Sequence, residues 1–288
     1  MKVKNTSVTR KLILPLLLGA SVAVILIVSA CQRQSQTVSL AELSPIVAEG
    51  SRAYELFQNH CAACHGRQGR GDGSAAIALN TVPRDFWNEP FRYISTMDGV
   101  PTKEDLAFTI GSGRVHGEMP SGPWLSDEDI SALSDFVLEL NRLGWAERLR
   151  EEFASEGMDE SEIQEISQER VTSEEPITVP MPGPVFLPDM QRGRDLYLAS
   201  CGSCHGSNGR GDGLDMPLDD LGRPISVRDL VSEPIQGGSD PVELFKRLRC
   251  GMPGTPMPSQ SLLSDDDIWQ LVYYTRFLMG QPLPTAGR

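Results

Sequence analysis

Apolar residues repeat at helical spacing in two stretches of the chain, near residues 130–140 and 268–278. In each stretch an apolar side chain returns to one helix face every three or four residues. The repeating positions are Ile130, Leu133, Val137 and Leu140, and then Ile268, Leu271, Thr275 and Leu278. A serine with an aspartate three residues later precedes each stretch, which is the spacing of a helix capping box with Asp in place of Glu. The pattern predicts two helices, here called the closing helices, that begin after Ser126 and Ser264.

The longest apolar run lies at the start of the chain, where an uncharged stretch over 12–30 follows four basic residues. This order is typical of an export signal, and a helix of that length nearly spans a bilayer. The run ends in Val-Ser-Ala-Cys at 28–31, which resembles a bacterial lipobox with Cys31 as the lipidated residue. We expect 1–31 to be a signal peptide with a lipobox or an uncleaved membrane anchor, followed by a polar tether over 32–44. A soluble periplasmic form is the third alternative, and all three place the remaining chain outside the cytoplasm.

The chain also contains an internal repeat. The segment CAACHG at 61–66 recurs as CGSCHG at 201–206, and GRGDG follows each copy. Met-Pro-Ser recurs at 119–121 and 257–259, ahead of the two capping serines. A period this long indicates duplicated domains rather than a solenoid. We expect one domain over 45–145 and a second over 188–288, each with its own helices and CxxCH motif.

Between the repeats, residues 146–187 carry eleven acidic and three basic residues and then become rich in proline. Such a composition is typical of an extended, solvated linker. Short helices within 146–170 are the alternative, because Trp145, Leu149 and Phe153 lie four residues apart.

The overall composition supports globular domains and excludes one class of partner. Apolar residues make up 40% of the chain and charged residues 23%, which is enough to bury a core. The net charge of −13 argues against nucleic acid, because phosphate binding requires clustered Lys and Arg.

The repeated Cys-x-x-Cys-His motif is typical of c-type haem attachment. Two thiols at this spacing can form thioethers with the two vinyl groups of one haem, and the following histidine places its imidazole at the iron. Zinc ligation would not need a histidine after each cysteine pair, a thioredoxin-like site would lie in a βαβ unit, and the trailing histidine argues against a disulfide. The sequence therefore predicts two covalently bound haem c groups, held by Cys61, Cys64 and His65 and by Cys201, Cys204 and His205.

On these motifs the chain resembles class I cytochromes c over nearly all of its length beyond the tether and linker. The resemblance implies a mostly α fold of two tandem cytochrome c domains, in which a helix leading into each CxxCH packs on a closing helix. The second unit has Gly193 and Tyr197 where the family pattern has them, whereas the first has Ala53 and Phe57, which indicates a slightly wider crossing. The aromatic residues expected at the two crossings are Phe136 and Tyr274.

The resemblance further implies a methionine as the second axial ligand of each iron. Met119 and Met257 lie in the paired Met-Pro-Ser loops, where the family places this ligand. Their rivals are Met252 and His116, neither of which has a matching residue in the other unit. Cys250 is a spare thiol, and we expect it to be buried as a small hydrophobe.

Two further pairs of segments surround the motifs. The segments 83–86 and 227–230 are similar to each other, and in the family a backbone carbonyl of this region accepts a hydrogen bond from the histidine Nδ1. Arg70 and Arg210 in the GRGDG loops either neutralise haem propionates or lie exposed, and we favour exposure.

These motifs together predict a dihaem c-type cytochrome that transfers single electrons and is not an enzyme. Its redox partners would be an upstream dehydrogenase or quinol oxidase and a downstream oxidase or reductase. It would act alone or as a subunit of a respiratory or dehydrogenase complex, attached to the membrane through its N-terminus. The alternative is a dihaem enzyme such as a cytochrome c peroxidase or a thiosulfate dehydrogenase, for which Cys250 would be the spare axial ligand.

Overall fold

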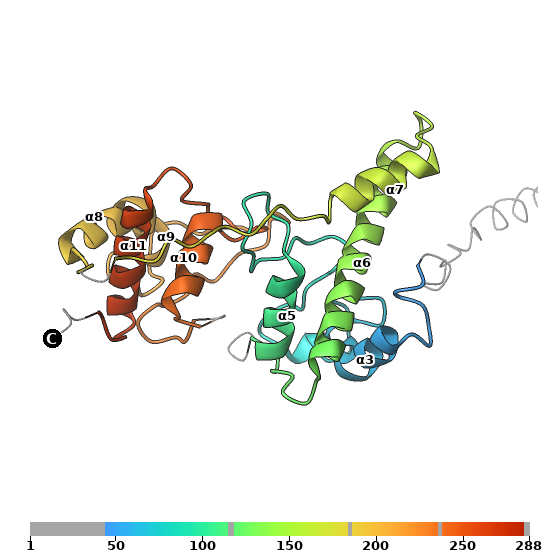
Figure 1. Cartoon of the computed structure of the whole chain (residues 1–288), viewed down its shortest axis with the longest axis horizontal. Helices are drawn as coiled ribbons and strands as arrows, with labels where there is room; N and C mark the ends of the chain where they lie inside the picture. Colours follow the sequence, from blue (N-terminus) through green and yellow to red (C-terminus); the bar gives the residue numbers. More distant parts are fainter. Residues whose placement is uncertain (1–43, 115–117, 184–185, 236–237, 285–288) are drawn as a thin grey trace, which may run out of the picture. The chain divides into compact units, whose positions relative to one another are not determined.

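The computed structural model describes residues 44–114, 118–183, 186–235 and 238–284, and these ranges form a mostly helical protein (Figure 1). No strand forms within them, and their only β-bridges are isolated ones, Arg114 with Met119 and Leu218 with Pro224. The mostly α fold expected from the sequence is thus confirmed. No helix among these residues is long and apolar enough to cross a membrane. The expected signal or anchor, Cys31 and nearly all of the tether lie outside the described residues.

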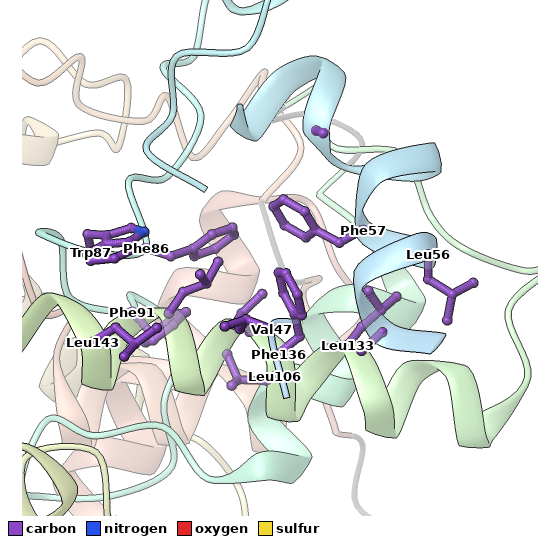
Figure 2. Packing of buried hydrophobic residues seen from close by; sticks show 14 of the residues in the cluster. Val47, Leu56, Phe57, Phe86, Trp87, Phe91, Leu106, Leu133, Phe136 and Leu143 are labelled. Atoms are coloured by element: carbon purple, nitrogen blue, oxygen red, sulfur yellow. The ribbon is translucent and has the colours of Figure 1, made fainter. Parts of the chain in front are cut away.

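The first repeat is built on one long helix. It contains α3 (Arg52–His60), α4 (Ala62–His65), the 3₁₀ turn η1 (Ala76–Ala78), α5 (Lys103–Ser112) and α6 (Asp127–Glu152). Both α3 and α5 pack on α6. The rings of Phe57 and Phe136 stack at 4.7 Å where α3 crosses α6, at the centre of a cluster that includes Phe86 and Leu133 (Figure 2). The aromatic crossing predicted for this unit is confirmed.

The second repeat has the corresponding helices. They are α8 (Met190–Ser200), α9 (Gly202–His205), α10 (Pro241–Cys250) and α11 (Asp265–Leu278), with α8 and α10 both packed on α11. Tyr197 and Tyr274 meet at the crossing with ring centres 5.4 Å apart. A Cβ atom on Gly193 would lie 2.7 Å from the backbone oxygen of Gln270, so glycine is what permits this close approach.

Both closing helices begin at the predicted serines. The backbone N–H groups of Asp129 and Asp267 donate to the hydroxyls of Ser126 and Ser264 at 3.2 Å. A full capping box would also have each aspartate carboxylate accept from the backbone N–H of its serine. Here each carboxylate instead pairs with an arginine of the helix that leads into the CxxCH motif, α3 or α8. These pairs are Arg52 with Asp129 and Arg192 with Asp267, each at 2.9 Å. The cap residue therefore also fastens α3 to α6 and α8 to α11.

The acidic part of the segment between the repeats differs from the solvated linker expected from its charge, whereas its proline-rich part over 173–183 contains no helix, in agreement with that expectation. The closing helix α6 continues to Glu152, and a further helix, α7 (Glu160–Glu169), packs on it. Arg142 is buried between them, with its guanidinium on Glu139 at 2.6 Å and near Ser167. Ala146 and Leu149 of α6 form a small apolar core with Ile163 of α7. The many charged residues around them made this core difficult to predict from the sequence. Helices within 146–170, the alternative interpretation of the sequence, are therefore confirmed.

Candidate haem-binding sites

Each Cys-x-x-Cys-His motif forms one helical turn directly after a long helix. The N–H groups of Cys61 and Cys201 donate to Phe57 O and Tyr197 O at 2.8 Å, and α4 and α9 then carry the second cysteine and the histidine. All four motif cysteines are free, half-buried thiols. Burial raises the pKa of Cys61 and of Cys201 to about 11. These two thiols are therefore protonated at neutral pH in the chain without haem.

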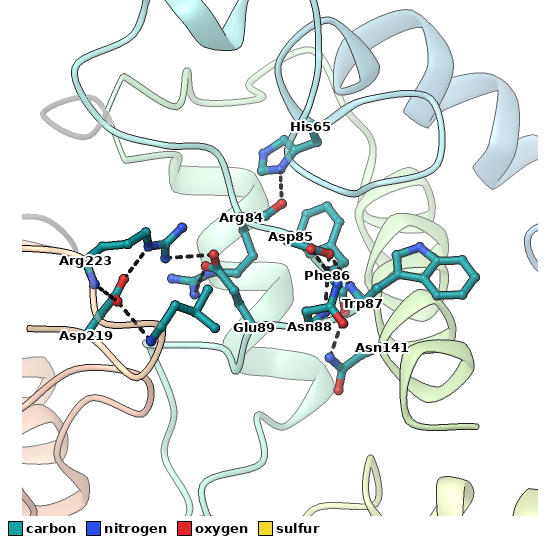
Figure 3. A network of polar contacts seen from close by, with 11 residues as sticks. His65, Arg84, Asp85, Phe86, Trp87, Asn88, Glu89, Asn141, Asp219 and Arg223 are labelled. Atoms are coloured by element: carbon teal, nitrogen blue, oxygen red, sulfur yellow. Dashed lines mark hydrogen bonds and ion pairs between the residues drawn. The ribbon is translucent and has the colours of Figure 1, made fainter. Parts of the chain in front are cut away.

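The two motif histidines are fixed in the same way. His65 Nδ1 lies 3.1 Å from Arg84 O (Figure 3), and His205 Nδ1 lies 3.2 Å from Arg228 O. Burial lowers the pKa of both imidazoles, so they are neutral, and a carbonyl can only accept, so Nδ1 carries the proton. The lone pair of Nε2 is thereby left for a metal. The carbonyls expected within 83–86 and 227–230 are those of Arg84 and Arg228.

The GRGDG loops fold back over the motif turns. The N–H of Gly73 donates to Cys64 O at 3.1 Å, and a Cβ atom on Gly73 would lie 2.3 Å from Ala63 O. Arg70 pairs with Glu147 of α6 at 2.8 Å and stacks on the Trp87 ring at 4.1 Å. Arg210 is exposed. Arg70 is thus engaged in packing α6, and Arg210 has the exposure favoured from the sequence.

Each predicted methionine ligand lies in a short loop closed by the residue five positions before it. Arg114 and Met119 exchange backbone hydrogen bonds of 2.7 and 3.1 Å, and the N–H of Met252 donates to Met257 O at 3.1 Å. Met252 is therefore the loop-closing counterpart of Arg114. Met119 and Met257 are half-buried, and Met257 packs against the core of its own unit. Their role as axial ligands stays a prediction, and His116 lies outside the described residues.

A backbone anomaly sits beside Met119. Glu118 has φ of 64°, a left-handed conformation that is unusual for a residue other than glycine. Its carboxylate accepts hydrogen bonds from the N–H of Thr81 at 2.9 Å and from Asn80 Nδ2 at 3.1 Å. These bonds hold the methionine loop against the segment that follows the GRGDG loop. The spacing of the sequence motifs gave no indication that Glu118 has this role.

Cys250 is buried as expected. Its side chain is 9% exposed and belongs to the apolar cluster of the first unit, although α10 is part of the second. Burial raises the pKa of its thiol to about 11. A protonated thiol in an apolar cluster is suited to packing and poorly suited to acting as a thiolate ligand.

A carboxylate bridge that sequence reasoning missed joins the two units. Glu89, 6% exposed, pairs with Arg84 of its own unit at 2.6 Å and with Arg223 of the second unit at 2.8 Å (Figure 3). Arg223 also pairs with Asp219 at 2.6 Å. The repeat contained one clue, because the second unit has an arginine and a glutamate at the same spacing, Arg228 and Glu233, which also pair, at 2.9 Å.

Both repeats match known protein families. Residues 50–141 match the family described as "Cytochrome c", and residues 188–274 match "Cytochrome C oxidase, cbb3-type, subunit III". No curated protein matches the chain. Among solved structures, a similar chain comes from the reducing HAO-like protein complex of Kuenenia stuttgartiensis. It is 28% identical with a TM-score of 0.65, and the match covers 79% of this chain and 96% of that chain. Each family match spans one CxxCH turn and its helices, and the protein therefore belongs to the class I cytochromes c, as a chain of two tandem cytochrome c domains.

Proposed function

We propose that this protein is a dihaem c-type cytochrome that passes single electrons between redox partners. The observation that carries the proposal is the duplicated arrangement of two half-buried, free thiols and a neutral imidazole whose Nδ1–H donates to a backbone carbonyl. Haem supplies reversible one-electron chemistry when it is bound. The residues of the chain attach it, orient its ligands and set its surroundings.

Each domain supplies a complete set of attachment groups. The thioether-forming cysteines and the iron-binding histidine lie on one turn, and the methionine lies on the loop before the closing helix. A methionine sulfur as the second axial ligand gives the haem a higher reduction potential than a second histidine would. The proposed sets are Cys61, Cys64, His65 and Met119 in the first domain, and Cys201, Cys204, His205 and Met257 in the second.

Partners and location follow from the same proposal. The basic and apolar N-terminus, ending at Cys31, supports attachment to the outer face of a bacterial membrane. There the chain would link an upstream dehydrogenase or quinol oxidase to a downstream oxidase or reductase. The similar chain from a reducing HAO-like protein complex supports a role as a subunit of a larger redox complex. Cys250 packs in the apolar cluster of the first domain, which does not favour an enzyme in which it is the axial ligand of the second iron.

The test is to count haems that survive denaturation. After acid-acetone extraction, the mass of the chain should exceed that of the polypeptide by two haems. A Cys201→Ala, Cys204→Ala variant should lose one. The protein should exchange electrons with small mediators without turning over peroxide or thiosulfate. Extractable haem would refute the cofactor assignment, and robust turnover of either substrate would favour an enzyme.

A further inference from the structure

A cavity of about 480 Å³ is lined by residues of both cytochrome c domains. The first domain contributes the segment 92–95, part of α5 and Arg114. The second contributes Glu243, Lys246 and Arg247 from α10. The cavity is therefore completed only when both domains are present.

Two guanidinium groups lie over one tyrosine ring at this cavity, and a third arginine lines it. Arg114 lies 4.1 Å from the centre of the Tyr93 ring and Arg247 lies 5.3 Å from it, while Arg92 is the neighbour of Tyr93 in sequence. Arg114 is only 6% exposed. The Nε atoms of Arg92 and Arg114 are buried without a hydrogen-bond partner among the described residues. The Nη atoms of Arg114 do have acceptors, Gly113 O at 2.7 Å and Thr109 Oγ1 at 2.6 Å. A buried guanidinium N–H normally finds an acceptor, so the two Nε–H groups are available for a ligand.

The acidic residues that line the cavity do not fill this role. The Asp105 carboxylate already accepts hydrogen bonds from the N–H groups of Ser95 and Thr102 at 2.9 Å. Glu243 pairs with Lys246 at 2.9 Å, and Glu104 is exposed on the first turn of α5. The cavity thus has an excess of positive charge.

The proximity of these charges opposes their own ionisation. Burial is the largest cause that lowers the pKa of Arg114 and of Arg247, and the charge of Arg247 lowers the pKa of Arg114 further. Tyr93 and Glu243 raise the pKa of both arginines, but the pKa of each still lies below its ordinary value. An anion between them would offset both effects, since a bidentate carboxylate is the preferred partner of a guanidinium.

The cavity is connected to one predicted ligand of the first haem by backbone hydrogen bonds and to the other through the sequence. Arg114 exchanges backbone hydrogen bonds with Met119, and the segment that carries Arg92 follows Arg84, whose carbonyl binds His65. The second domain has no equivalent, because Met252 occupies the position of Arg114. The two repeats therefore differ in residues that line this cavity.

We propose that this cavity binds a propionate carboxylate of the first-domain haem, and that Arg247 of the second domain completes its binding site. The inference rests on the proposed haem at Cys61 and Cys64. The second domain thereby contributes directly to the surroundings of the first haem, and its α10 leads from that propionate towards the Met257 loop.

The test uses the full-length holoprotein with Arg247→Gln and with Arg194→Gln, an exposed arginine of the same domain, as the charge-matched control. Haem content is measured first, because fewer than two haems would refute the proposed function and not this site. Redox titration of Arg247→Gln should show a lower reduction potential for one haem only, with a new pH dependence near neutrality from the unpaired propionate. Met257→Ala, which alters the second haem, identifies which haem has shifted. Arg247→Lys should restore most of the potential.

A free oxyanion could supply the same chemistry, and a second measurement separates the two sources. Inorganic phosphate is added to the wild-type holoprotein at constant ionic strength while the haem potentials are recorded. If a propionate already occupies the site, added phosphate should not change the haem potentials. A saturable shift that Arg247→Gln abolishes would overturn the propionate assignment in favour of a free anion. Unchanged potentials in Arg247→Gln, or equal shifts of both haems, would overturn the site altogether.

Discussion

At the scale of single residues, the duplicated sequence separates ligand candidates from their neighbours. Met252 and Met257 lie in the same loop, yet Met252 uses its backbone to close the loop as Arg114 does in the first domain. Met257 instead packs its side chain against the core of its domain. The two methionines therefore form a matched pair for testing which sulfur is the ligand.

Replacing Met257 by Ala should remove the weak near-infrared absorption of ferric haem with a thioether ligand from one haem of the two. The reduction potential of that haem should also fall, because a methionine sulfur raises it. Absorption spectra of the oxidised holoprotein provide the measurement. Met252→Ala, the control, should leave the band at full intensity, and the reverse result would transfer the ligand role to Met252.

A second pair of matched residues tests the carboxylate bridge. Glu89 is buried and compensates Arg84 and Arg223, whereas its counterpart Glu233 is half exposed and pairs with Arg228 alone. Glu89→Gln should lower the free energy of unfolding by about 3 kcal/mol, because it leaves the half-buried Arg84 without a carboxylate, while Arg223 keeps Asp219. Glu233→Gln should cost less than about 1 kcal/mol. Urea unfolding of the two holoproteins gives both values, and equal losses would contradict the bridge.

At the scale of elements, local signals in the sequence were sufficient for the closing helices. A capping serine acts on residues three positions away, and the apolar repeat identifies the buried face, so both helices begin where expected. The helix α7 was difficult to predict because nearly all of its residues are polar or charged and only a few pack on α6. The pairing of Arg52 with Asp129 joins residues 77 positions apart, which no local pattern encodes.

The crossing of α8 and α11 gives a prediction at this scale. Gly193→Ala should destabilise the second domain by about 1–3 kcal/mol, because the new methyl would lie 2.9 Å from the Tyr274 Cβ as well as against Gln270 O. The loss should appear in thermal unfolding followed at the haem absorbance. Gly183→Ala is the control, since a Cβ there meets nothing within 4 Å. A neutral or stabilising Gly193→Ala would show that α8 can move away from α11 without cost.

At the scale of the whole molecule, the repeat predicted two domains but not how much they share. Each repeat has its own helices and CxxCH turn, which is why the sequence indicated two self-sufficient units. In the structure Cys250 of the second domain packs in the first apolar cluster, and Ile177 of the connecting segment contacts both clusters. Arg247 and Arg223 likewise make their contacts with residues of the first domain. Such contacts depend on tertiary docking and leave no periodic trace in the chain.

The charge of the whole molecule leads to a last prediction, on electron exchange with mediators. The chain has 39 acidic and 26 basic residues, so it should attract cations over distances longer than a contact. The second-order rate constant for a cationic one-electron reductant should therefore fall as salt rises towards about 0.15 M, where screening limits attraction to roughly 8 Å. An anionic reductant should show the opposite trend, and a neutral one serves as the control. Stopped-flow measurements give these rates. If the anionic reductant were instead fastest at low salt, the local arginines near the first haem would outweigh the net charge, and docking would be to an acidic surface of the partner.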